Sequence, residues 1–207
     1  MATRWAHPVV VSSLALNLTG QAWAASLPSI AVVAFNQAAI DTATLSRPKT
    51  EVGRIYGEAG VCVTWMESAA AVKPAGPFAI QLLLRRRPVD GSASVMGTAI
   101  GDVHETSGSA FVFYDRVLSS AHGGQHDVAR VLAYAIAHEM GHLLLPHPAH
   151  SPSGIMRPDW DGDDLRHIAS GSLQFTAVQA NAIRAKVSGC CAAADARTTT
   201  GSPLSKP

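Results

Sequence analysis

Cysteine is scarce in this 207-residue chain, which has three cysteines and no pair of them at C-x-x-C spacing. This scarcity excludes zinc ribbons and similar sites built from pairs of thiolates. In an oxidising compartment, one disulfide from Cys62 to Cys190 or to Cys191 is compatible with the sequence, and a buried free Cys62 is the alternative. A metal site, if there is one, must draw on other side chains.

Charge is also sparse: charged residues make up 15% of the chain, and the formal net charge is +1. The basic run at 85–87 is more typical of the solvated end of a strand than of a binding patch. A chain without basic clusters has no electrostatic footprint for nucleic acid, so we expect no nucleic-acid partner. The composition is that of one ordinary globular domain, which we expect to be a monomer.

The N-terminal apolar run, VVVSSLALNL, is shorter than the roughly 20 residues that a membrane-spanning helix needs. It follows the basic start MATR and precedes Ala22-Trp23-Ala24, a small-x-small pattern. We therefore predict a signal peptide over 1–24, cleaved near Ala24, and a secreted or periplasmic protein without stable membrane insertion. A buried first strand or an uncleaved anchor is the alternative. Cleavage would remove Arg4 and no acidic residue, leaving a net charge of zero.

Hydrophobic periodicity predicts an alternation of strands and helices over 25–189, followed by a disordered tail over 190–207. A strand, a helix and a second strand in succession imply a parallel pair with a right-handed crossover. The fold class is α/β (α+β), with a small mixed sheet packed on a buried helix. The predicted strands are 29–35, 61–65, 78–84, a brief one at 96–100, and 110–117 at a sheet edge; the helices are 46–60, one capped by Asp127, and 176–187.

The stretch HEMGHLLLPHPAHSPSGIM, from His138 to Met156, carries the chemistry. His138 and His142 are four residues apart on the helix that Asp127 caps, so their imidazoles lie on one face, a turn apart. Two imidazoles at this spacing can bind one ion, and Glu139 can reach a water beside it, which is the content of H-E-x-x-H. Two histidines and a carboxylate in an apolar helix would otherwise each need a buried partner. Zn²⁺ is the default ion for such a site.

A catalytic zinc takes three protein ligands and keeps one position open. A later glutamate is excluded as the third ligand, because the chain contains none after Glu139. His147 directly follows Pro146, which ends the helix, and has little chain with which to turn back. His150 has more slack and is the favoured ligand. The remaining candidates are four aspartates: Asp159, Asp161, Asp163 and Asp164.

This stretch resembles the metzincin clan of zinc peptidases, whose signature is HExxHxxGxxH followed by a Met-turn. His138, Glu139 and His142 match the first half, and Ser153-Gly154-Ile155-Met156 is similar to the Met-turn, with Met156 as its methionine. The middle departs from the signature, because Leu145 and Pro148 stand where the clan has glycine and histidine. The resemblance is thus to an exported bacterial type with a stretched ligand loop, in which His150 is the third ligand.

The resemblance implies a zinc endopeptidase in which Glu139 is the general base toward a zinc-bound water. It also implies that a protein or peptide substrate adds as a strand along the sheet edge, which we expect to be 110–117. Pro158 stands where some metzincins have a tyrosine, so that role is vacant here. The alternatives are a zinc hydrolase of a non-peptide amide and a non-catalytic zinc-stabilised domain. Trp160 is expected to be a packing residue.

Overall fold

The computed structural model describes residues 27–67, 78–88, 95–101, 105–121 and 125–199, with side chains described to residue 190. The predicted signal peptide over 1–24 lies outside the described residues. The described part of the chain contains no helix long and apolar enough to cross a membrane.

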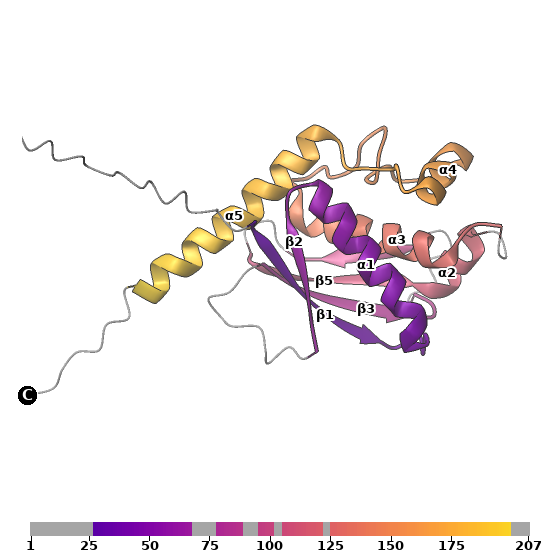
Figure 1. The fold of residues 1–207 in the computed structure, drawn as a ribbon, viewed down its shortest axis with the longest axis horizontal. Helices are drawn as coiled ribbons and strands as arrows, with labels where there is room; N and C mark the ends of the chain where they lie inside the picture. The colour runs from indigo at the N-terminus through magenta and orange to yellow at the C-terminus, as the bar shows by residue number, and fades with distance from the viewer. Residues whose placement is uncertain (1–26, 68–77, 89–94, 102–104, 122–124, 200–207) are drawn as a thin grey trace, which may run out of the picture.

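A five-stranded mixed sheet has the order β2-β1-β3-β5-β4. Strands β2, β1, β3 and β5 are parallel, and β4 runs antiparallel to β5 at one edge (Figure 1). The strands are β1 (Ser29–Asn36), β2 (Cys62–Met66), β3 (Phe78–Arg85), β4 (Gly97–Ile100) and β5 (Ser107–Phe113). The helices are α1 (Thr42–Glu58), α2 (Tyr114–Ser120), α3 (Val128–Leu144), α4 (Gly162–Ser170) and α5 (Ala177–Thr199).

Helices α1 and α3 lie side by side over one face of the sheet (Figure 1). The burial of β3 alternates accordingly: Ile80 and Leu82 are buried, whereas Gln81 between them is exposed. The hydroxyl of Tyr56 on α1 donates to the carbonyl oxygen of Ala137 on α3 at 3.0 Å, and Tyr56 is fully buried. The predicted fold class, a mixed sheet packed on a buried helix with a later C-terminal helix, is confirmed.

Two predictions about strand 110–117 were wrong. The strand ends at Phe113, because β3 ends at its register partner Arg85, and the chain continues as α2. It is also not an edge strand, because β4 pairs with its outer side. The edge strand is β4 itself, in the Gly/Ser-rich stretch that predicted only a brief strand.

Two helix boundaries also differ from the prediction. Helix α1 begins at Thr42, before the predicted Ser46, because the Asp41 side chain accepts from the backbone N–H of Thr44 at 3.0 Å and caps the helix there. Helix α5 continues to Thr199, beyond the predicted end at residue 187.

Candidate metal centre

Helix α3 carries the first two histidines in a fixed geometry. The Asp127 side chain accepts from the backbone N–H of Ala129 at 3.0 Å, which caps the helix as predicted. The helix is then buried on all sides from Val131 to Gly141, so it can neither shift nor turn without disrupting the core. The Nε2 atoms of His138 and His142 face each other at 3.1 Å. Two nitrogens bound to one tetrahedral ion at about 2.0–2.1 Å each would have a similar separation.

The segment after α3 places His150 beside His138 and His142. Pro146 follows the helix end, and the chain returns so that the His150 ring centroid lies 5.4 Å from that of His138 and 4.7 Å from that of His142. Each of the three histidines offers one ring nitrogen, and these nitrogens all lie within 4.8 Å of one another. The three histidines, which we call the triad, can hold a metal ion. His150 is exposed, so the triad opens on the solvent side.

A backbone carbonyl fixes the orientation of His138. Its Nδ1 lies 2.8 Å from the carbonyl oxygen of Ile155, and Nε1 of Trp160 donates to the same oxygen at 3.2 Å. When Nδ1 carries the proton and donates it, Nε2 keeps the lone pair that a metal ion requires. The Trp160 ring also packs edge-on against the His138 ring, with centroids 5.9 Å apart. Trp160 therefore packs against His138 and helps to hold the carbonyl oxygen that accepts from it, and it also lines the cavity.

Burial keeps the imidazoles of His138 and His142 in the neutral form that binds metal. It lowers the pKa of His138, and together with the neighbouring histidines it lowers the pKa of His142 to about 4. Both rings are then neutral at pH 7, because desolvation disfavours the imidazolium. A metal ion has no proton to displace from these two side chains at neutral pH.

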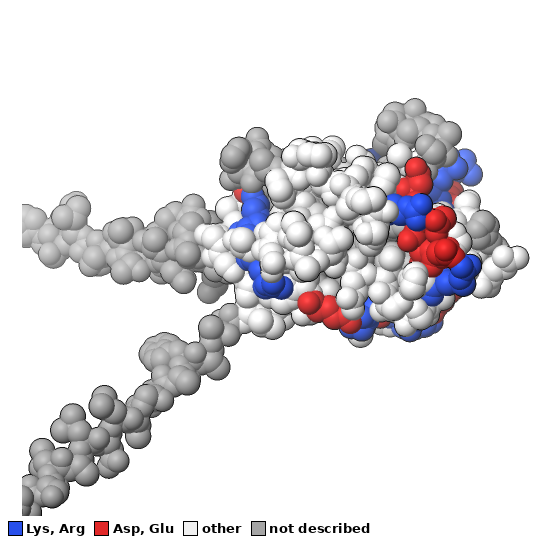
Figure 2. Space-filling view, turned by 90° about the horizontal axis from the view of Figure 1, so that it is seen from above, with Lys and Arg blue, Asp and Glu red and all other residues white. Residues whose placement is uncertain are grey.

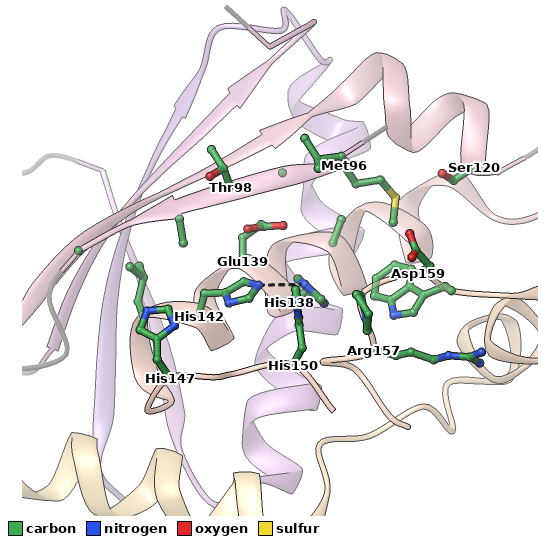
Figure 3. A pocket seen from close by; sticks show the side chains of 18 residues that line it. Met96, Thr98, Ser120, His138, Glu139, His142, His147, His150, Arg157 and Asp159 are labelled. Atoms are coloured by element: carbon green, nitrogen blue, oxygen red, sulfur yellow. Dashed lines mark hydrogen bonds between the residues drawn. The ribbon is translucent and has the colours of Figure 1, made fainter. Parts of the chain in front are cut away.

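Glu139 lies on the β4 side of the triad (Figure 3). Its side chain is 6% exposed, and burial raises the pKa of its carboxyl to about 8. It packs across Gly97 of β4 so closely that a Cβ at residue 97 would lie 2.5 Å from its Cγ and 2.5 Å from the carbonyl oxygen of Phe111. Glycine at 97 is therefore what makes room for the Glu139 side chain. The sequence reasoning missed this residue, and no local pattern marks it.

The predicted Met-turn packs against α3. Met156 is fully buried, and a Cβ at Gly141, between the two helical histidines, would lie 2.5 Å from the Met156 Sδ. Gly154 has a positive φ of 79°, a conformation that favours glycine. The N–H of Ile155 donates to the carbonyl oxygen of Gln174 at 3.1 Å. These contacts hold the Ile155 carbonyl in position to accept from His138.

The other candidate ligands lie outside the triad. His147 is exposed and lines the same cavity. Asp161 and Asp164 pair with Arg157 at 2.6 and 2.7 Å, Asp163 pairs with Arg166, and Asp159 lines the cavity farther along. Among the described cysteines, Cys62 is exposed on β2, Cys190 is buried in α5, and no disulfide joins them.

The triad and Glu139 line a cavity of about 520 Å³. The edge strand β4 forms one wall, and the segment 157–160 closes the end opposite His147 (Figure 3). Along β4 the Phe113 N–H donates to the carbonyl oxygen of Met96 at 2.8 Å, and residues of an antiparallel ladder alternate between bonded and unbonded pairs. The backbone groups of Gly97 and Ala99 therefore point away from β5, toward an edge that no other strand of the described residues covers.

No protein family and no curated protein matches the chain. Among solved structures, it is similar to archaemetzincin from Methanopyrus kandleri, with a TM-score of 0.45, 17% identity, and coverage of 80% of this chain and 98% of the other. It is also similar to the protein TM1509 from Thermotoga maritima, with a TM-score of 0.33, 11% identity, and coverage of 86% and 99%. Both likenesses are remote.

Proposed function

We propose that the chain is an exported zinc-dependent endopeptidase, in which His138, His142 and His150 hold the ion and Glu139 is the general base. The observation that carries the proposal is the convergence of three ring nitrogens within 4.8 Å, with Glu139 lining the same cavity. Bound zinc would supply Lewis acidity toward a carbonyl oxygen and would lower the pKa of a water molecule.

The residues of the chain would divide the remaining work. Glu139 takes a proton from water in the cavity onto its carboxylate and later delivers it to the leaving amine. A cation in the triad would lower the pKa of Glu139 from the value that burial imposes and so make the carboxylate available. The His138 bond to Ile155 holds the metal-binding nitrogen in place, and Met156 supports α3 beneath the triad.

The free edge of β4 supports a peptide substrate over a small amide. An extended peptide can pair with the backbone of Gly97 and Ala99 by strand addition, which would run its backbone past Glu139. The peptide would therefore pair with β4 and not with strand 110–117, which we expected to be the sheet edge. The proposal also disfavours a purely structural site, because such a site is usually closed by a fourth protein ligand, and His147 lies outside the triad.

The test is to load the purified protein with zinc and to measure cleavage of casein and of a peptide library. Glu139→Gln, which keeps the shape of the side chain but cannot accept a proton, should lose at least about 100-fold in activity. Asp163→Asn is the matched control, since Asp163 lies on α4 outside the cavity and pairs with Arg166. Equal activity of Glu139→Gln and the wild type would end the proposed mechanism.

A further inference from the structure

The end of the cavity opposite His147 is lined by side chains that differ from those of the triad. The segment 157–160 lines it, with Met96 and Ser120 on the β4 side (Figure 3). It therefore presents a thioether, a hydroxyl, an indole and a carboxylate to whatever lies there. The triad and Glu139 use none of these groups except the Trp160 N–H, which is bonded to Ile155.

The carboxylate in this set is Asp159. Its side chain is exposed, and no described residue makes an ion pair or hydrogen bond with it. Arg157, two residues away, does not neutralise it, because its Nη1 donates to Asp161 at 2.6 Å and to Asp164 at 2.7 Å. The Arg157 guanidinium is thus shared by Asp161 and Asp164, and Asp159 makes no ion pair with it. Acidic and basic side chains alternate at the end of the molecule that carries α4 (Figure 2).

The neighbours of Asp159 fit a long aliphatic stem. Met96 is unbranched and polarizable, which suits contact with a flexible methylene chain. Trp160 offers an aromatic ring, which attracts cations as well as methylene groups. Ser120 adds a hydroxyl that can accept a hydrogen bond from an ammonium or guanidinium group. An acidic side chain at this end would meet like charge, and an apolar one would leave the carboxylate without a partner.

From this arrangement we propose that the end of the cavity lined by Met96, Ser120, Asp159 and Trp160 is a subsite for a lysine or arginine side chain of the substrate. The inference rests on the proposed function, since it names the class of peptide that the endopeptidase would cleave. Asp159 is the residue that determines the preference for a basic side chain, by accepting hydrogen bonds from its cationic end.

The experiment uses short peptides that are acetylated at the N-terminus and amidated at the C-terminus, so that side chains carry the only charges. A peptide with one arginine is compared with its leucine and glutamate counterparts, with the varied residue placed in turn on either side of the central bond. Binding is measured by calorimetry with the zinc-loaded Glu139→Gln variant, and cleavage is measured with the zinc-loaded protein that retains Glu139. Both measurements are repeated after Asp159→Asn, Asp159→Lys or the control Asp163→Asn has been added to each protein.

The arginine peptide should bind at least about fivefold more tightly than the leucine peptide, as expected for a hydrogen-bonded ion pair. Asp159→Asn should remove this preference, Asp159→Lys should shift it toward glutamate, and Asp163→Asn should leave it unchanged. A preference that survives Asp159→Asn, or that Asp163→Asn removes equally, would overturn the subsite. Binding that depends on Asp159 without any cleavage would instead retain the subsite and end the proposed peptidase function.

Discussion

Glu139 is buried, and without a cation nearby this burial would prevent it from acting as a base. Its carboxyl is buried on a helix that is buried on all sides, and burial raises its pKa to about 8. At neutral pH without a metal ion it would mostly carry a proton and could not act as a base. A cation held by the triad favours the carboxylate by direct attraction. In the proposed mechanism, a bound metal ion would therefore control the charge of the general base.

The first prediction concerns Glu139 in the metal-free protein. Folding raises the pKa from 4.5 to about 8, so the native state binds the proton more tightly than the unfolded state does. The wild type therefore loses stability as pH rises through this interval, whereas Glu139→Gln does not. In urea unfolding with a chelator, the variant should gain more than about 1 kcal/mol relative to wild type between pH 5 and pH 8.5. Glu105→Gln, at an exposed position, should show no such gain, and a pH-independent difference for Glu139→Gln would contradict the account.

The second prediction concerns Gly97. A Cβ here would meet both Glu139 and the Phe111 carbonyl at 2.5 Å, so Gly97→Ala must displace one of them. We expect kcat for peptide cleavage to fall by at least about tenfold, because a misplaced general base transfers protons poorly. Gly53→Ala is the matched control: a Cβ there meets nothing within 4 Å, and alanine in a helix is favoured by up to about 1 kcal/mol. If Gly97→Ala keeps full kcat, glycine is not needed to position Glu139.

Among the elements, α3 was the easiest to predict from the sequence. Asp127 caps it, apolar residues surround it, and Pro146 follows its end, so local and tertiary signals agree. Helix α4 was missed, although Asp161 and Asp164 form a capping box at its start, because the helix is only nine residues long. Strand β4 was recognised only in part, and its place at the sheet edge was not. Strand order depends on packing between distant segments, which periodicity within one segment does not record.

Inside the site, the choice between His147 and His150 also depended on how distant segments pack. Chain slack and the metzincin resemblance favoured His150, and the structure brings its ring to His138 and His142. The role of the triad as zinc ligands stays a prediction. Neither spacing nor motif could indicate that Ile155 accepts from His138, or that Asp159 lines the cavity beyond it. These contacts depend on how the chain between α3 and α4 folds back on the helix.

The third prediction belongs to β4. Ala99 lies in an unbonded pair of the ladder, so its N–H faces the free edge, whereas the backbone of Thr98 bonds with β5. Ala99→Pro should raise KM for peptides by at least about fivefold with little loss of stability, because it removes one donor to an added strand. Thr98→Pro should instead destabilise the fold. Peptide cleavage with an unchanged KM in Ala99→Pro would show that the substrate does not pair with this edge.

At the scale of the whole molecule, the triad brings together segments that the sheet does not join. His138 and His142 come from α3, His150 from the returning segment, and Ile155 links that segment to the chain before α5 through Gln174. An ion held by the triad would fasten this connection. Ligand binding to the native state stabilises it in proportion to the logarithm of the ligand concentration.

The fourth prediction follows for thermal stability. Zinc at about 100 times its Kd should stabilise the native state by about 2.7 kcal/mol and raise Tm, and a chelator should reverse the change. Differential scanning fluorimetry at pH 7.5, with magnesium as the control ion, measures the change in Tm. A Tm that does not change when zinc is added at pH 7.5 would contradict a metal centre.

The most direct test is the zinc affinity of two single variants, measured by competition with a chromophoric chelator at pH 7.5. Histidine is removed in both, from the same segment and three residues apart, so the two proteins differ chiefly in the ring nitrogen that is lost. We predict one zinc per chain, a loss of affinity of more than about 100-fold for His150→Ala, and a change within about threefold for His147→Ala. Equal losses in the two variants, or a larger loss for His147→Ala, would contradict three imidazoles from positions 138, 142 and 150 sharing one ion.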